Sequence, residues 1–69
     1  MNEKYYRVAF YLTIIKYQFS LLNEALDALG EYNPTMREVS ALMKEIDHEI
    51  EVDGRKLLKR IERGDNDAN

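Results

Sequence analysis

Apolar residues in the first thirty positions recur at alternating spacings of three and four, which is the pattern of an amphipathic helix with a heptad-like seam. This row consists of Tyr5, Val8, Leu12, Ile15, Phe19, Leu22, Leu26 and Leu29. A second row at similar spacings consists of Phe10, Ile14, Tyr17, Leu21 and Ala28. At 3.6 residues per turn, the second row lies on nearly the opposite side of the same helix. The sequence therefore predicts a helix from Glu3 to Leu29 with two apolar faces.

A two-helix protein needs only one of these faces for its own core. The surplus face has to be buried against a second copy of the chain or against another protein. Tyrosine suits such a surface because it buries a large ring while its hydroxyl stays in contact with water. We therefore expect the partner or oligomer interface at Phe10, Tyr11, Ile14, Tyr17 and Leu21.

A second helix is predicted after a short turn at Glu31 to Asn33. Gly30 is expected to end the first helix in the left-handed conformation. The Asn33-Pro34 pair has the residue types of an N-cap and a first helical position, and Thr35 begins a competing capping box two residues later. A connection this short makes the two helices antiparallel neighbours.

The second helix carries a single apolar stripe, and most of its other positions are charged. The stripe consists of Met36, Val39, Leu42, Met43, Ile46, Ile50, Leu57 and Ile61. Asp53-Gly54 interrupts it, and Asp-Gly is a strong turn dipeptide.

Two interpretations of this interruption are open. One is a single helix weakened at Gly54, and the other is a helix that ends near Val52 and a short third helix from Arg55 to Arg63. We favour the continuous helix, because only Leu57 and Ile61 reach far enough to cover the start of the first helix. It predicts that Gly54→Ala stabilises the fold by some tenths to about 1 kcal/mol.

These elements predict an all-α antiparallel helical hairpin over residues 3–64, followed by a disordered polar tail at 65–69. The chain has only 69 residues, and a domain of this size rarely has stability to spare. It has no cysteine, so disulfides are excluded. We therefore expect oligomerisation to complete the core, with a homodimer in a four-helix bundle as the predicted assembly.

The composition also favours a cytoplasmic protein. The net charge of −3 gives no general attraction to nucleic acid or to an anionic membrane. The apolar run from Val8 to Ile15 is well short of the roughly 20 residues of a membrane span, and no signal-peptide cleavage site follows it. The lack of cysteine fits a reducing compartment.

No motif in the chain indicates a catalytic chemistry. His48 is the only histidine, and it lies among acidic residues on the predicted water-facing side of the second helix. This arrangement is typical of a solvated face rather than a metal site. The chain has no glycine-rich phosphate loop and no pair of carboxylates that spacing forces together. We expect a protein that is not an enzyme and that uses no cofactor, metal or small-molecule substrate.

Two groups of mostly basic residues make nucleic acid an alternative partner. One group ends the second helix and consists of Arg55, Lys56, Lys59, Arg60 and Arg63. Cations at this position also complement the helix dipole. The other group, Lys4, Arg7 and Gln18, shares a flank of the first helix with Tyr11. These side chains fit equally well beside a helix–helix seam, with their charged ends in water.

In length, hairpin layout and a polar tail after the last helix (Gly64-Asp65-Asn66-Asp67), the chain resembles the Rop-type plasmid copy-number regulators. Those proteins are short helical hairpins that dimerise into a four-helix bundle and bind paired RNA loops. The resemblance therefore implies a dimer and an RNA-binding role. It includes no specific motif, and the first helix here is far more aromatic.

The sequence favours a small non-enzymatic regulator, inhibitor or adaptor that forms a homo-oligomer. In this interpretation the protein presents its helical apolar and aromatic face to a partner protein. A Rop-like dimer that binds RNA or DNA is the first alternative, and a subunit of a hetero-oligomeric assembly is the second.

Overall fold

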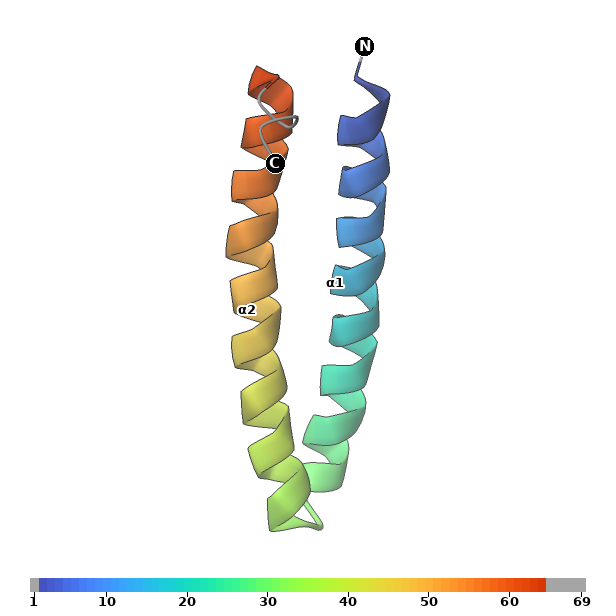
Figure 1. The fold of residues 1–69 in the computed structure, drawn as a ribbon. Helices are drawn as coiled ribbons and strands as arrows, with labels where there is room; N and C mark the ends of the chain where they lie inside the picture. Colours follow the sequence, from blue (N-terminus) through green and yellow to red (C-terminus); the bar gives the residue numbers. More distant parts are fainter. Residues whose placement is uncertain (1, 65–69) are drawn as a thin grey trace.

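The computed structural model describes residues 2–64, which form two long helices joined by a tight turn. Helix α1 spans Glu3–Gly30 and helix α2 spans Pro34–Arg63. The helices run antiparallel, so the start of α1 and the end of α2 lie at the same end of the hairpin (Figure 1). The predicted all-α hairpin is confirmed for this part of the chain, whereas the predicted disordered tail at 65–69 lies outside the described residues.

Local signals at the helix ends explain where α2 begins and ends. The Asn33 side-chain oxygen accepts hydrogen bonds from the backbone N–H groups of Thr35, at 2.8 Å, and Met36, at 3.3 Å. Pro34 occupies the first turn, as the sequence predicts. Gly64 ends α2 with a φ of 87°, in the left-handed region that glycine adopts without strain.

Gly30 does not have the conformation that the sequence predicts for it. It is the last residue of α1 and has no positive φ, and among the described glycines only Gly64 does. The reason for a glycine here is the close approach of α2. A Cβ atom on Gly30 would lie 3.3 Å from the Arg37 Cα atom, so the missing side chain lets the two backbones meet next to the turn.

Gly54 marks a second close approach, and α2 continues through it without a break. The favoured interpretation of one continuous helix is thus confirmed, and the short third helix is wrong. Gly54 is buried, and a Cβ atom there would lie 3.0 Å from both methyl carbons of Leu12. The simple expectation that Gly54→Ala stabilises the helix is therefore incomplete, because the new methyl group competes with Leu12 for space.

The contact row of α1 departs from the predicted seam after Phe19. Leu22 and Leu29 are 42% and 51% exposed, and their places next to α2 are taken by Asn23 and Gly30. Two consecutive steps of four, from Ile15 to Phe19 to Asn23, shift the row away from a strict heptad. This spacing follows the 3.6-residue period of a straight helix instead of the 3.5-residue period of a coiled coil.

The contact row of α2 departs from the predicted stripe in the same way. Met36, Val39, Met43, Ile50 and Ile61 are buried or half-buried as predicted. Leu42, Ile46 and Leu57, in contrast, are 58%, 46% and 40% exposed. The positions that face α1 in their stead are Ser40, Asp47, Gly54 and Leu58. Small and polar residues thus share the contact with large apolar ones, and three large apolar residues of the predicted stripe are left outside it.

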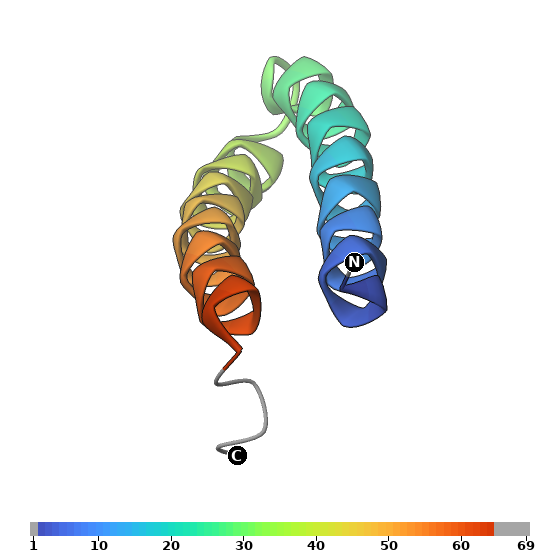
Figure 2. The ribbon, with the colours of Figure 1, turned by 90° about the horizontal axis from the view of Figure 1, so that it is seen from above.

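Seen from above, the helices form one layer of two elements (Figure 2). Each helix therefore has a neighbour on one side only. In the described part of the chain, Leu26 and Ile61 are the only buried hydrophobic residues. A hairpin of this shape places most of its apolar side chains at the surface.

The close approach of Leu12 to Gly54 predicts energetic coupling between these two positions. In a Leu12→Ala background, Gly54→Ala should stabilise the fold by about 1 kcal/mol, because alanine has the higher helix propensity and nothing opposes its methyl group. With Leu12 present the gain should be smaller or reversed. Urea denaturation of all four variants at one protein concentration measures the difference. Equal effects of Gly54→Ala in both backgrounds would contradict the contact.

Candidate interaction surface

Large apolar side chains at the surface are the most prominent feature of this structure. The exposed set consists of Tyr6, Phe10, Tyr11, Ile14, Tyr17, Leu21, Leu22, Leu29, Tyr32, Leu42, Ile46 and Leu57. All five side chains predicted for an interface belong to this set. Phe10 and Tyr17 are the most open of the five, at 61% and 62%, and Ile14 is the least open, at 38%. Their role as an interface stays a prediction.

Part of this set forms a continuous surface across both helices. Viewed down the hairpin, successive residues advance clockwise along one helix and anticlockwise along its antiparallel neighbour. For this reason the residues that precede the α1 contact row around that helix and those that precede the α2 contact row around its helix lie on the same face of the hairpin. We call this surface the flat face, and it consists of Tyr11, Leu22, Leu29, Leu42, Ile46 and Leu57.

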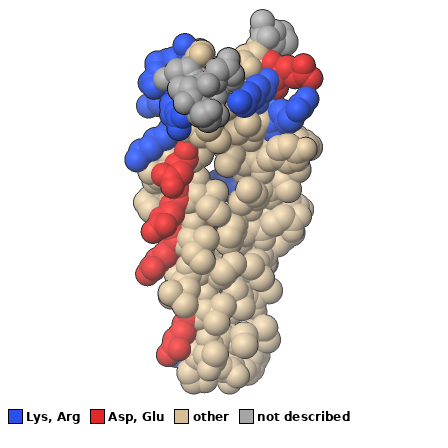
Figure 3. All heavy atoms as spheres, viewed as in Figure 1, with Lys and Arg blue, Asp and Glu red and all other residues tan. Residues whose placement is uncertain are grey.

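Figure 3 shows this side of the molecule as a broad area almost free of charged side chains. A column of acidic residues borders it along α2, and basic residues border it at the end where the chain begins and α2 ends. Glu38, Glu45, Glu49 and Asp53 recur at spacings of seven and four, so they share one side of α2 and form this acidic column. An apolar centre with a charged rim is the usual composition of a protein interface.

A second apolar surface lies along α1 on the side away from α2. We call it the outer edge of α1, and it consists of Tyr6, Phe10, Tyr17 and Leu21. At 100° per residue around α1, Ile14 lies between the outer edge and the flat face. The five predicted interface residues are thus divided between two surfaces, a division that the α1 pattern alone does not show. The contribution of α2 to the flat face was missed, because Leu42, Ile46 and Leu57 were assigned to the seam.

The basic residues that the sequence separates into two groups come together at one end of the hairpin. We call this the open end, and it comprises residues 2–11 and 54–64. Lys4 and Arg7 lie at this end on α1. The five basic residues at the end of α2, from Arg55 to Arg63, lie beside them. All these side chains are exposed. Among the ion pairs here, Arg7 pairs with Glu3 at 3.3 Å and Arg55 pairs with Glu51 at 2.9 Å. Gln18 is also exposed but lies three turns farther along α1.

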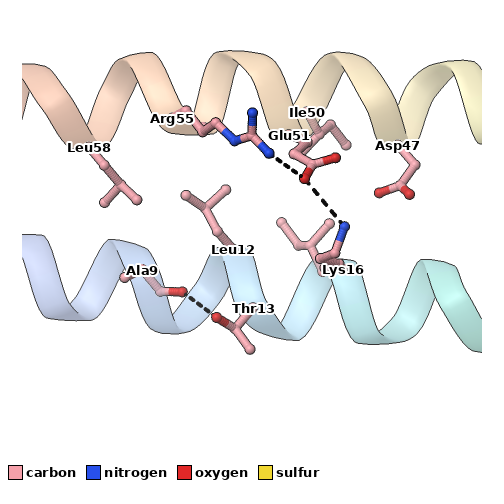
Figure 4. A pocket seen from close by; sticks show the side chains of 11 residues that line it. Ala9, Leu12, Thr13, Lys16, Asp47, Ile50, Glu51, Arg55 and Leu58 are labelled. Carbon is pink, nitrogen blue, oxygen red and sulfur yellow. Dashed lines mark hydrogen bonds and ion pairs between the residues drawn. The ribbon is translucent and has the colours of Figure 1, made fainter.

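The opposite side of the hairpin is polar and is linked across the two helices. Glu51 accepts hydrogen bonds from Lys16 of α1, at 3.4 Å, and from Arg55 one turn later on α2, at 2.9 Å (Figure 4). These charges lie over a cleft of about 210 Å³ between the helices, where Leu12 and Leu58 supply apolar walls. Side chains that reach across this cleft hold the helices in place.

A second polar link lies nearer the turn. The buried Ser40 hydroxyl donates a hydrogen bond to the Asp27 carboxylate, and the Lys44 ammonium lies 3.3 Å from the same oxygen. These two donors lower the pKa of Asp27 below its ordinary value, and the Ser40 hydrogen bond has the larger effect. The pKa of Glu51 is lowered as well, first by the charge of Lys16 and then by its hydrogen bond.

Three further polar features were missed from the sequence. The Asn2 side-chain amide donates to the Ile61 carbonyl at 3.1 Å, which ties the two ends together. The Arg37 guanidinium donates to the Gly30 carbonyl at 2.8 Å and closes the turn. Asn23 is half-buried in the contact row, and its buried side-chain oxygen has no hydrogen-bond partner among residues 2–64. The bonds of Asn2 and Arg37 join residues far apart or across the turn, so local sequence patterns gave no signal for them.

Residues 2–64 contain neither a membrane-spanning helix nor a cluster of metal-ligand side chains. No described helix is long and apolar enough to cross a membrane. In the same residues no three His, Cys, Asp or Glu side chains come together in a way that would hold a metal ion.

Comparison with models of protein families, with curated proteins and with solved structures finds no match to this chain. The resemblance to Rop-type regulators therefore remains one of layout, and the surface described above is the basis for assigning a role.

The lowered pKa of Asp27 predicts a loss of stability in acid. A carboxyl group whose pKa is depressed in the folded state stabilises the fold above its unfolded pKa, which is about 4. That contribution disappears as the pH falls through the folded value. The difference in unfolding free energy between the wild type and Asp27→Asn should therefore be largest near pH 6 and shrink towards pH 3.

Urea denaturation at several pH values tests this expectation. Glu24→Gln is a suitable control, because it removes an exposed carboxylate one turn away that takes no part in the Ser40 hydrogen bond. A wild-type advantage over Asp27→Asn that is the same at pH 6 and pH 3 would contradict the role of this carboxylate.

Proposed function

We propose that this chain is a small non-enzymatic interaction protein that acts as a homo-oligomeric regulator, inhibitor or adaptor. It works by burying apolar helical surface against other polypeptides, first a second copy of itself and then a partner protein. The observation that carries this proposal is the imbalance between its interior and its surface. Twelve large apolar side chains are exposed in the described residues, whereas two hydrophobic residues are buried.

The energetic argument follows from this imbalance. Each large apolar side chain that stays in water forgoes about 1.5–3 kcal/mol of burial. Single exposed apolar residues are common on any protein, but a contiguous patch bordered by charges is typical of an interaction site. A two-helix layer of this size also has little core of its own to offset its ordering entropy. Association therefore supplies stability that the isolated hairpin lacks.

The grouping of basic residues at the open end favours nucleic acid as a second candidate partner. The hairpin brings seven lysine and arginine residues from both helices to one end. Binding of RNA or DNA through this end predicts nucleic acid in the purified protein and an affinity that falls steeply with salt. A subunit of a hetero-oligomer remains the third candidate, and it predicts poor solubility when the chain is expressed alone.

Self-association is the first testable consequence. Sedimentation velocity at micromolar concentrations should show a dimer or larger species, and the melting temperature should rise with protein concentration, because association stabilises the folded chain. A monomer whose melting temperature does not depend on concentration would overturn the proposal.

Two isoleucines of α2 provide matched variants for this test. Ile46 belongs to the flat face and is 46% exposed, whereas Ile61 is fully buried against α1. Ile61→Glu should abolish the helical circular dichroism at all concentrations, because it buries a charge in the hairpin itself. Ile46→Glu should instead shift the association to higher concentration. If Ile46→Glu leaves both the association and the melting temperature unchanged, the flat face is not an interface.

A further inference from the structure

We infer that the flat face binds the flat face of a second copy in the antiparallel orientation, so that the basic open end of each chain lies beside the net acidic turn half of the other. The inference rests on the proposed function, and it adds which of the two apolar surfaces forms the dimer, in which direction the copies run, and which charges select that direction.

The first observation is the separation of charge along the hairpin. The open end, residues 2–11 and 54–64, carries seven basic and two acidic residues. Residues 12–53 carry three basic and nine acidic residues. The hairpin is therefore positive at the open end and negative over the remainder, including the turn. Such a molecule attracts a copy of itself when the two run in opposite directions and repels it when they are aligned.

The second observation is that symmetry leaves few ways to stack the flat face on itself. In a two-fold dimer the same patch is used by both copies. If the axis runs along the hairpin, the copies are parallel and α2 of each lies on α1 of the other. If the axis runs across the hairpin, the copies are antiparallel and α2 lies on α2. Both arrangements bury the same apolar side chains, so the charges at the rim decide between them.

The parallel arrangement is the unfavourable one. It places the basic end of α2 next to Lys4 and Arg7 of the second copy, and both open ends meet. The antiparallel arrangement places the α2 edges side by side in opposite directions. Glu38, at the turn end of the acidic column, then lies opposite the part of the second α2 that contains Lys56 and Lys59. Every pair of neighbouring helices is antiparallel in both arrangements, so the helix dipoles do not choose between them.

The antiparallel dimer leaves the outer edge of α1 uncovered. This edge lies to the side of the two stacked layers and not between them. Its aromatic side chains, Tyr6, Phe10 and Tyr17, stay exposed on both copies of the dimer. The two apolar surfaces thus have different uses, the flat face for the second copy and the outer edge for the partner in the proposed function.

Distances between spin labels on the two copies test the orientation. The chain has no cysteine, so each introduced cysteine is a unique labelling site. Tyr32 lies in the turn and is 85% exposed. In the antiparallel dimer the two turns lie at opposite ends, so labels at Tyr32→Cys should be separated by about one helix length, roughly 40 Å. A parallel dimer brings the same labels within roughly 20 Å.

A label at the middle of α2 serves as the control for dimer formation. His48 is exposed and lies near the midpoint of Pro34–Arg63. His48 lies on the side of α2 away from the flat face, so labels at His48→Cys are separated by little more than the thickness of the two layers in the antiparallel dimer. A distance at position 48 that is well below the distance at position 32 is the expected result. A distance at position 32 no longer than that at position 48 would overturn the antiparallel orientation while leaving the proposed self-association intact. The absence of any coupling at position 48, with a monomer in sedimentation, would overturn both.

Charge reversal tests the pairing at the rim. Glu38→Lys in the acidic column occurs twice in the dimer and should weaken self-association roughly three- to tenfold at low salt. Glu24→Lys makes the same change of charge on α1 outside the flat face, and it should change the dissociation constant less than twofold. The difference should shrink at high salt, because exposed charges are screened. Equal effects of the two variants would overturn the charge pairing.

Discussion

The contact between α1 and α2 decides what this molecule can do with its apolar residues. Within it, small residues lie beside large apolar ones: Gly30 adjoins the Arg37 backbone, Gly54 adjoins the Leu12 side chain, and Ser40 is buried. Because small residues occupy these contact positions, large side chains such as Leu22 and Ile46 flank the contact and remain exposed.

The same contact gives the hairpin two unlike sides. On one side, Lys16 reaches Glu51 and the Ser40 hydroxyl reaches Asp27, so polar groups cross from helix to helix. Exposed ion pairs of this kind add little stability, and they fix the relative position of the helices more than they strengthen the fold. The other side is flat and apolar between its charged borders (Figure 3). A partner on that side can bury surface without separating any of these polar links.

The start of α2 was predictable from sequence, and the contact rows were not. Asn33 and Pro34 act through groups two or three residues away, so their meaning is local. The contact row of α1 depends on a period accumulated over many turns, and a single extra step of four replaces Leu22 by Asn23. Apolar character could not reveal the change, since most of the replacing residues are small or polar, such as Asn23, Gly30 and Ser40. A surplus of apolar positions was visible on α1, but the share contributed by α2 depended on the true seam.

The role of small residues suggests how such a sequence is better interpreted. A glycine inside a predicted helix, such as Gly54, lowers the helix propensity. At the spacing of the contact row it also makes room for a side chain of the neighbouring helix, here Leu12. With Gly54, Ser40 and Gly30 assigned to the contact, the leucines beside them belong to the outer surface. An apolar surface on both helices then follows from the sequence, and with it the need for a second layer of helices.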